Sequence, residues 1–506
     1  MSVLSILLDG EVIHPMVLLS LAAVTMLVGY VLFWVIYNLF FHPLSKFPGP
    51  RLWAISTIPY IRNFTAGECH FTILEMHKKY GPIVRVGPND LSLNHPDGMK
   101  ALRGHRKSGT GENSKEPVAA SFNADNVIGA NRENHQRYRR TLAHGFSQHS
   151  MMAQQPIIRV YVDKLMKGLH AASDNGTKPV DIATWYNFTT FDVIGDLAFG
   201  EPFGCLDTGK LHPWITLIFA GMKDLAFITT MARTPWLNNL WNLVTPKKST
   251  SEWASHVEMA REKVRKRLAS GMDRPDFIDA MLKRTGAAGN EMTFEELASN
   301  AQILMIAGSE TTATVLTATT YFLASNPETL KKVVNEVRSG FSSENDINMD
   351  SVKKLTYMLA CLNEGMRVFP PVINGSVRTI RPEGDDIIGH YIPGGATVDV
   401  WQWAVHNNPD HFAHADQYIP ERWLDNNDPR FANDAKQALN PFSIGPRDCV
   451  GKNLAYAEMR MILARVLWNF DVSLHPDTPG WEKRTKSYFL WERGAMNVML
   501  TPRKTE

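Results

Sequence analysis

The sequence predicts a mostly α-helical α+β domain that follows a single membrane-anchoring helix. Helical patterns with boundary signals recur along most of the chain, whereas short strand patterns occur near residues 83–94 and 377–400. The anchor is indicated by a stretch without Asp, Glu, Lys or Arg from Val12 to Ser45. A chain of 506 residues with 44% apolar residues is long enough to bury a large core. We therefore expect a helix-rich domain with small sheets.

The uncharged N-terminal stretch predicts a transmembrane helix over residues 15–41. It exceeds the roughly 20 residues that cross a bilayer, and aromatic residues lie near one end, where they anchor helices at the interface. A cleaved signal peptide would begin with basic residues, whereas this chain carries Asp9 and Glu11 there. Lys46 and Arg51 follow the span, so the positive-inside tendency places the domain in the cytosol. The alternative is a buried core helix.

A proline-rich segment separates this anchor from the rest of the chain. Residues 47–50 read FPGP, and proline cannot continue a helix because it lacks the amide donor. No internal repeat or long linker divides the remaining sequence. We expect an anchor over residues 1–45, a hinge over 46–50 and one catalytic domain over 51–506.

Several of the expected helices carry explicit boundary signals. Thr293 and Glu296 have the spacing of a capping box, and Pro275 and Pro327 suit a first helical position. Strands are expected where short apolar runs follow turn residues. The expected helices are 131–147, 156–172, 184–198, 213–232, 251–270, 275–284, 293–324, 327–341, 357–368 and 451–470, and the expected strands are 83–86, 91–94, 377–379, 387–392 and 397–400.

Composition and motifs exclude several classes of function. The 53 basic and 51 acidic residues nearly cancel, and without a basic run they give no nucleic-acid footprint. Nucleotide-binding glycine motifs, a nucleophile elbow and HExxH are missing. The four cysteines lie far apart without a CxxC pair, which argues against a disulfide framework or a structural zinc site. Any cysteine with a chemical role must act alone.

One cysteine, Cys449, stands in a loop that suits a thiolate. The loop runs from Phe442 to Gly451, reads FSIGPRDCVG and precedes an apolar helix. Gly445 and Gly451 let backbone amides approach the sulfur, the helix N-terminus supplies positive potential, and Arg447 adds a cation. Such a cysteine is a metal ligand or a nucleophile, and the alternative is a buried structural cysteine.

This loop fits FxxGxRxCxG and resembles the haem-ligand loop of the cytochrome P-450 superfamily. Three more motifs follow the order of that family: AGSETT at 307–312 resembles the oxygen-activation motif, residues 364–367 match ExxR, and PERW at 420–423 resembles PERF. The resemblance covers the whole chain, and FHPLSKFPGP is closest to the wording of fungal members. It implies the cytochrome P-450 fold.

The resemblance implies haem b as the cofactor, with Cys449 as the axial thiolate that donates electron density to the iron. Phe442, Gly445 and Gly451 of the same loop are expected to bind the haem. Cations are needed for its two propionates, and His135 stands where the family usually has Trp. For the basic run 137–140 as a whole, a solvated or docking surface is the alternative. The candidates for the propionates are Arg447, Arg378, Arg139 and His135.

A polar pair in an apolar helical stretch, Glu310 and Thr311, indicates oxygen chemistry. By resemblance, Thr311 organises the hydrogen bonds that deliver protons, and Glu310 connects them to solvent. Gly308 is expected to leave room for dioxygen beside the helix. The alternative is helix packing by small residues with a back-bonded threonine. The presence of the pair favours a monooxygenase over an enzyme that rearranges peroxides.

The resemblance also implies a charged triad that holds the cysteine loop. Glu364 and Arg367 lie at i and i+3 on one helix face and can pair with each other and with Arg422. By resemblance, substrate contacts are expected at residues 121–128, 213–232 and 372–376, on Ile303 and Ala307, and near Phe489. These positions are mainly apolar or aromatic and include Phe122, Phe219, Met222, Phe227 and Ile373.

The sequence thus predicts a haem-thiolate monooxygenase that hydroxylates or epoxidises a lipophilic small molecule, in fungal secondary metabolism by resemblance. Electrons are expected from an NADPH-dependent cytochrome P-450 reductase, with cytochrome b5 as a second donor, because the chain has no flavin or NADPH motif. We expect a single-pass protein of the endoplasmic reticulum membrane that binds no nucleic acid. The alternatives are a reductase-independent peroxide or epoxide rearrangement on the same haem, and a membrane haemoprotein without turnover.

Overall fold

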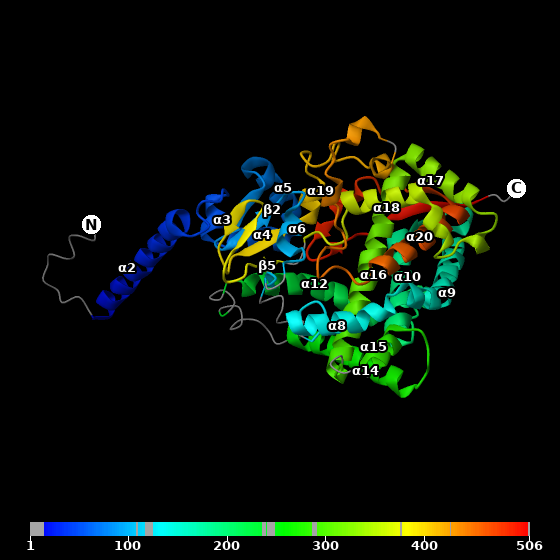
Figure 1. Cartoon of the computed structure of the whole chain (residues 1–506), viewed down its shortest axis with the longest axis horizontal. Helices are drawn as coiled ribbons and strands as arrows, with labels where there is room; N and C mark the ends of the chain where they lie inside the picture. Colours follow the sequence, from blue (N-terminus) through cyan, green and yellow to red (C-terminus); the bar gives the residue numbers. More distant parts are fainter. Residues whose placement is uncertain are drawn as a thin grey trace.

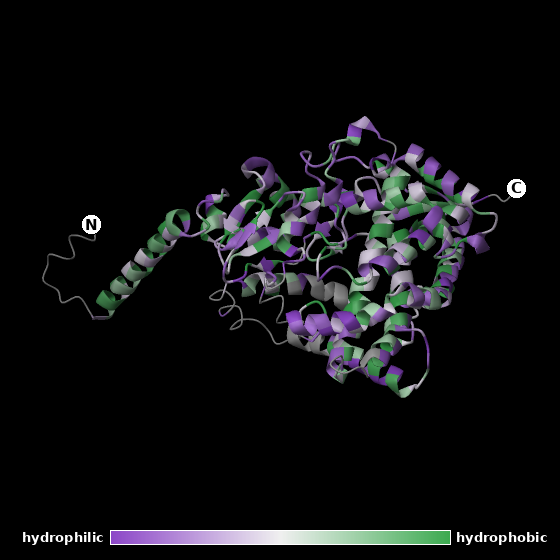
Figure 2. Ribbon diagram, in the orientation of Figure 1, coloured by the Kyte–Doolittle hydropathy of each residue, from purple (hydrophilic) through white to green (hydrophobic). Residues whose placement is uncertain are grey.

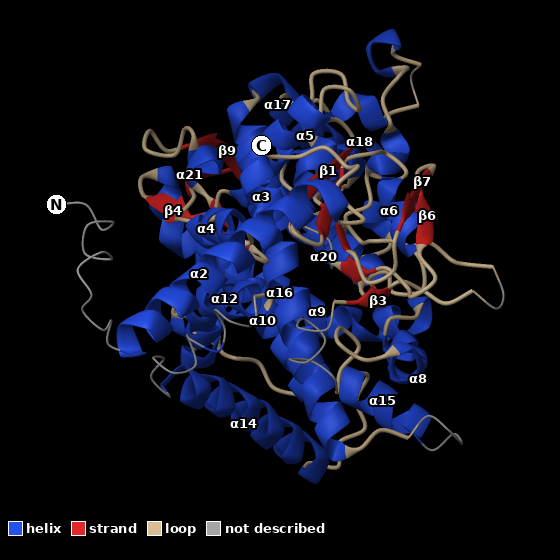
Figure 3. Ribbon diagram, turned by 90° about the vertical axis from the view of Figure 1, so that its left-hand side faces the viewer, coloured by secondary structure: helices blue, strands red, loops and turns tan. Residues whose placement is uncertain are grey.

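The computed structural model shows a helix-rich domain with small sheets and one projecting N-terminal helix, which confirms the predicted class (Figures 1 and 3). Part of the expected substrate segment, residues 121–124 with Phe122, lies outside the described residues. The structure describes residues 15–107, 110–116, 125–234, 239, 248–285, 291–374, 377–425 and 427–503.

The helices follow the predicted order, with corrections at two starts. Helix α9 begins at Gln148 rather than Pro156, because the Ser147 hydroxyl caps it by accepting the Ser150 N–H. Helix α15 begins at Phe277 rather than Pro275. Short helices between residues 51 and 103 were not predicted. The helices are α2 (Pro15–Ile36), α3 (Arg51–Ile55), α4 (Ile58–Ala66), α5 (Cys69–Tyr80), α6 (Gly98–Arg103), α8 (Arg132–Gly145), α9 (Gln148–Ser173), α10 (Ile182–Phe199), α11 (Cys205–Thr208), α12 (Pro213–Ala232), α14 (Lys248–Ala269), α15 (Phe277–Thr285), α16 (Phe294–Ser325), α17 (Pro327–Gly340), α18 (Thr356–Val368), α19 (Gln402–His406), α20 (Lys452–Asn469) and α21 (Trp481–Arg484).

The largest sheet of the described chain has the order β1-β2-β8-β5-β3, in which β2 and β8 are parallel and the other pairs antiparallel. The single strand expected at 387–392 is wrong. Ile388 and Gly389 have positive φ angles of 54° and 72°, which form a tight turn and split the segment into a β6–β7 hairpin. The strands are β1 (Ile83–Gly87), β2 (Asp90–Leu93), β3 (Ser114–Lys115), β4 (Pro179–Asp181), β5 (Arg378–Thr379), β6 (Asp385–Ile387), β7 (His390–Ile392), β8 (Thr397–Val400), β9 (Phe470–Leu474), β10 (Lys486–Ser487), β11 (Trp491–Glu492) and β12 (Asn497–Pro502).

Helix α2 projects from the domain as an apolar rod (Figures 1 and 2). With the π-helical turn that follows it, the stretch Pro15–Phe41 has 27 residues, and none of its apolar window is buried, so it is long and apolar enough to cross a membrane. Its end is attached to the domain, because the Trp34 indole N–H donates to the Ile55 carbonyl (2.8 Å).

The expected hinge at residues 46–50 is packed rather than free. The Arg85 N–H of β1 donates to the Pro48 carbonyl (2.8 Å), and its guanidinium donates to the carbonyl of the buried Asn38 (2.6 Å). A Cβ at Gly49 would collide with the Arg85 carbonyl, so the segment lies directly on β1. The prolines redirect the chain, and β1 fixes its path.

Helix α16, 32 residues long, lies in the interior and has its most extensive contact with α10 (Figure 1). The capping box of Thr293 and Glu296 is present at its start, as predicted. A Cβ at Gly308 would lie 2.8 Å from the Cδ1 of Ile194 on α10. The space at the Cβ position of Gly308 therefore holds Ile194, while Gly308 itself is only half-buried, so the expected room for dioxygen stays a prediction.

We predict that Gly308→Ala destabilises the domain through this contact. Overpacking costs about 1–3 kcal/mol, which exceeds the ~1 kcal/mol that alanine gains over glycine in a helix. Ile194→Val removes the colliding methyl group and should rescue the variant, so the double variant should be more stable than the two single effects predict. Urea unfolding of all four proteins measures this coupling. If the two single changes in unfolding free energy sum to that of the double variant within about 0.5 kcal/mol, the result would argue against the contact.

Candidate functional site

Cys449 closes a turn just before α20. Its N–H donates to the Phe442 carbonyl (2.8 Å), and the backbone amides of Gly451 and Lys452 donate to its sulfur. Cys449 is exposed, whereas the other three cysteines are buried. Among the described residues no cluster of three or more His, Cys, Asp or Glu could hold a metal ion. The loop thus presents one accessible thiol with backbone donors.

The cation beside this thiol is Arg139 rather than the expected Arg447. Surrounding protein atoms raise the pKa of Cys449 above its usual value, while the Gly451 amide and then Arg139 oppose that rise. Arg447, the expected cation, instead bonds the Glu112 carboxylate (2.9 Å) and the Ala130 carbonyl (2.9 Å). Arg139 therefore takes the electrostatic role that the sequence assigned to Arg447.

The path of the loop depends on Gly445. Its φ of +83° disfavours other residues, and a Cβ there would collide with the Arg103 carbonyl at the end of α6. The Arg103 side chain lies 3.4 Å from the Ser443 hydroxyl. A Cβ at Gly451 would lie 3.9 Å from the Cys449 sulfur, which is an ordinary van der Waals distance.

Buried positive charge gathers beside this loop. Arg378 of β5 is buried, and its Nη1 has no hydrogen-bond partner among the described residues. Burial, followed by the nearby Arg103 and Arg447, lowers the pKa of Arg378 to about 9. Burial and the same three arginines hold the pKa of Lys115 well below its usual value. The cluster attracts anions.

Two carboxylates balance this cation cluster incompletely. Arg103 lies 3.9 Å from Asp399 and Arg447 lies 2.9 Å from Glu112. A group that carries two further negative charges would satisfy the unpartnered, buried donor of Arg378 and the surplus charge. The donor set of one accessible thiol and a buried cation cluster therefore fits a haem with two propionates.

The two remaining candidates for the propionates have other contacts. Arg139 pairs with Asp448 (2.7 Å). Burial, then Arg447 and Lys115, lower the pKa of His135 to about 4, so it is neutral near pH 7 and offers an N–H rather than a charge. Both residues line a surface cavity of about 250 Å³. Arg137 of the same basic run binds Glu296 (2.5 Å), so that part of the run stabilises helix packing.

One face of α16 is much less buried than the rest of the helix. Ile303 and Thr311 are half-buried and Ala307 is exposed, and the spacing of four residues places them in one line. The Thr311 hydroxyl donates to the Ala307 carbonyl (2.6 Å), as the back-bonded alternative predicted. This face has room for other atoms.

Glu310 is buried on another side of α16, which corrects its expected contact with solvent. Its side chain is 4% exposed and pairs with Arg493, a residue that the sequence did not single out. Arg493 lies in an irregular segment after β11, where periodicity gives no signal.

The substrate segments are described in part. Ile373 is buried, and Phe489 is half-buried with its ring 5.6 Å from that of Phe64. The side chains of Phe219 and Met222, like Phe122, lie outside the described part of the chain.

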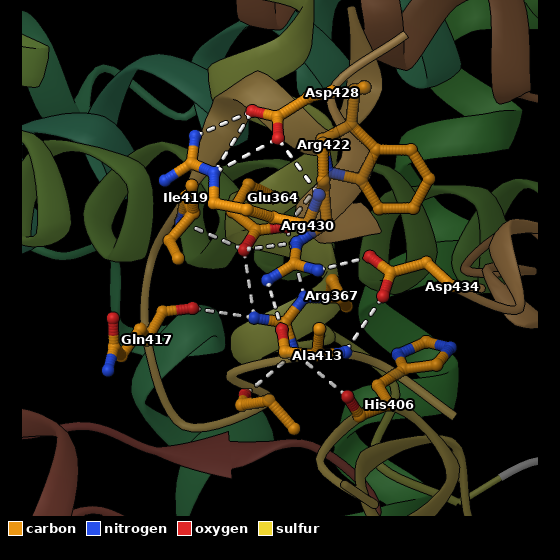
Figure 4. A network of polar contacts seen from close by, with 12 residues as sticks. Glu364, Arg367, His406, Ala413, Gln417, Ile419, Arg422, Asp428, Arg430 and Asp434 are labelled. Carbon is orange, nitrogen blue, oxygen red and sulfur yellow. Dashed lines mark hydrogen bonds and ion pairs between the residues drawn. The ribbon is translucent and has the colours of Figure 1, made fainter. Parts of the chain in front are cut away.

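The triad residues form a fully buried network (Figure 4). Glu364 accepts two hydrogen bonds from the Arg367 guanidinium (2.8 and 3.0 Å), one from Arg422 (3.0 Å) and one from the Ile419 N–H (2.9 Å). Burial alone would raise the pKa of Glu364, but the two arginines lower it below its usual value. The carboxylate is therefore charged.

Two partners of this network were missed. The Trp423 indole N–H donates to the second Glu364 oxygen (2.8 Å), and Asp434 pairs with Arg422 (Figure 4). The positive charges of the two arginines then equal the negative charges of the Glu364 and Asp434 carboxylates. The motif reads PERW rather than PERF, and this departure could have identified Trp423, because an indole N–H that is removed from water needs an acceptor. No local sequence pattern points to Asp434.

We predict that Trp423→Phe lowers the free energy of unfolding by about 1–3 kcal/mol, since it removes a hydrogen bond to a buried charge. Trp468→Phe is the matched control, because Trp468 is half-buried and its ring contacts Arg503. Chemical denaturation of the full chain compares them. An equal loss in both variants would show that ring size, not the indole N–H, matters.

Comparisons with known proteins identify the family of this chain. The family model for cytochrome P-450 matches residues 47–499. The chain is 48% identical over 476 residues to a trichothecene C-15 hydroxylase of Fusarium sporotrichioides, covering 94% of this chain and 96% of the relative.

Two further fungal relatives cover similar lengths. A cytochrome P-450 monooxygenase of Talaromyces stipitatus is 43% identical, over 95% of this chain and 94% of its own length. An averantin hydroxylase of Dothistroma septosporum is 40% identical, over 95% and 91%. This chain therefore belongs to the cytochrome P-450 family, whose monooxygenases bind haem b through a cysteine thiolate.

Proposed function

We propose that this monooxygenase hydroxylates or epoxidises a lipophilic intermediate of fungal secondary metabolism. The similar proteins include hydroxylases of trichothecene and of averantin, which supports both the reaction and the substrate class. The described candidates for substrate contact, Ile303, Ala307, Ile373 and Phe489, are apolar, which suits a substrate with little charge.

We assign the haem contacts from the arrangement of this chain's own side chains. Haem b, when bound, supplies an iron that activates dioxygen with thiolate assistance. Cys449 is the thiolate, and the amides of Gly451 and Lys452 stabilise its negative charge. Arg378 and Arg447 bind the propionates, Arg378 through its free Nη1.

The remaining residues of the site orient these groups and handle protons. Phe442 accepts the Cys449 N–H and so sets the direction of the thiol, and Gly445 lets the loop lie on α6. Thr311 holds a proton on the open face of α16, where its hydroxyl already donates to Ala307. Glu310, next along the helix, is the acid from which that proton is replaced.

The single observation that carries this function is the accessible Cys449 thiol with backbone donors beside a buried cation cluster. We predict that Cys449→Ser abolishes the red-shifted Soret band of the reduced carbon-monoxide complex, because a serine hydroxyl is not a thiolate. Thr311→Ala is the control and should keep the band, since Thr311 contacts neither the thiol nor its amides. A normal band in Cys449→Ser would remove Cys449 as the ligand.

We also propose the location and the electron donor. The apolar N-terminal helix supports a membrane anchor, and Lys46 and Arg51 after it support a cytosolic location for residues 46–506 at the endoplasmic reticulum. On that side an NADPH-dependent cytochrome P-450 reductase, or cytochrome b5, supplies electrons. The chain itself has no flavin or NADPH motif, which supports an external donor.

Glycosylation tests this orientation. Of the N-x-S/T sites in the domain, Asn175 is exposed, whereas Asn63, Asn187 and Asn374 are partly or fully buried. We predict that Asn175 stays unmodified in a eukaryotic host, because the cytosol lacks the transferase. Thr177→Ala removes the site and is the control, so both proteins should migrate equally before and after glycosidase treatment. A mobility shift that Thr177→Ala abolishes would place the domain in the lumen.

A further inference from the structure

The ion pair of Glu310 and Arg493 is buried in the centre of the domain. Both side chains are 4% exposed, and an Arg493 N–H donates to Oε1 of Glu310. Thr314 of the same helix lies 3.4 Å from Oε1. The other oxygen, Oε2, is buried and has no partner among the described residues. The carboxylate is thus held by one oxygen and free at the other.

Arg493 is itself held in one orientation by three acceptors on two helices. Its Nη1 donates to the Thr317 hydroxyl of α16 (3.2 Å), and its Nη2 donates to the Asn187 side chain of α10 (3.2 Å). A guanidinium with three fixed acceptors has little freedom, so it determines where Oε1 of Glu310 lies.

Arg493 directly follows the β10–β11 hairpin, which carries candidate substrate residues. Phe489 lies between the two strands, and the neighbouring Glu492 pairs with Lys223 of α12 (2.6 Å). The hairpin is fixed to the core by the Trp491 indole N–H, which donates to the Pro370 carbonyl (2.7 Å). Arg493 therefore joins this hairpin to α16 and α10.

The charge of Glu310 depends on this arginine. Burial raises the pKa of Glu310, and Arg493 is the charged group that opposes the rise. From the described elements around it, α10 presents the neutral Asn187, and α16 presents the neutral Thr314 and Thr317. Removal of the guanidinium would leave burial unopposed and raise the pKa further.

We propose that Arg493 is a positioning residue that holds Oε1 of Glu310, leaves Oε2 as the oxygen that takes up and releases the proton, and connects this carboxylate to the Phe489 hairpin. The inference rests on the proposed role of Glu310 in proton delivery. Arg493 touches Glu310 rather than the reacting atoms, so it acts through the carboxylate. A substrate that displaces the hairpin displaces Arg493 and changes the proton donor.

Infrared spectroscopy of the haem-loaded full chain tests the proposal without a substrate. The carbonyl stretch of protonated Glu310 is assigned by its loss in Glu310→Gln and followed against pH. In Arg493→Gln the band should persist to a pH about 1–3 units higher than in the unchanged protein, because an adjacent cation lowers a carboxyl pKa by that amount. Arg493→Lys, which keeps the charge, should titrate closer to the unchanged protein.

Arg484→Gln is the matched control, since Arg484 lies near the same segment and binds the Pro479 carbonyl. An unchanged midpoint in Arg493→Gln, or an equal shift in Arg484→Gln, overturns the proposal. If Arg493→Gln does not fold, the double variant Glu310→Gln/Arg493→Gln is tested for folding instead. A double variant that folds supports the ion pair, because removal of both charges relieves the unpaired carboxylate. A double variant that also fails to fold overturns the proposal.

The two proposals fail separately in this experiment. The Soret band of the reduced carbon-monoxide complex, recorded on the same samples, reports the haem-thiolate site alone. A normal Soret band with an unshifted infrared titration overturns the role of Arg493 and leaves the proposed function intact. An abnormal Soret band in the unchanged protein overturns the proposed function.

Discussion

Five hydrogen bonds converge on the buried Glu364 carboxylate, and the irregular segment before the cysteine loop depends on them. Arg367 and Arg422 bind it, and their other donors reach main-chain carbonyls and the Asp434 carboxylate (Figure 4). A buried charge without partners costs several kcal/mol, so each partner is held where the network needs it. The carbonyls bound by the two arginines are those of His406, Ala413, Ala415 and Gln417.

This arrangement explains how residues 407–451, which contain short turns but no strand or long helix, keep a defined path. Side-chain donors replace the backbone ladder that a helix or sheet would supply. Asp434 extends the network toward the cysteine loop by binding Arg422 and the Ala413 N–H. The network thus fixes the chain at several points between His406 and Asp434, which precedes the cysteine loop.

The sequence predicts those features that depend on neighbours along the chain, such as helix α12 with its N-terminal proline and the capping box of α16. It fails where the partner is distant. Gly308 gives no sign of its contact with Ile194 of α10, which lies far earlier in the chain. Arg447 suggests a cation for the thiol until Glu112 binds it. Motif order located Cys449, Glu364 and Thr311, whereas Asp434 and Arg493 lie in segments without a periodic pattern.

The faces of helix α16 differ in how tightly they pack against the rest of the domain. The Gly308 face is closed against α10, where an added methyl group has no room. The line of Ile303, Ala307 and Thr311 stays open, so side chains there can change size without disturbing the core. Glu310 lies on the opposite flank of this line from Gly308, where it is buried and paired with Arg493. The open line of α16 therefore runs between a closely packed glycine contact and a buried ion pair.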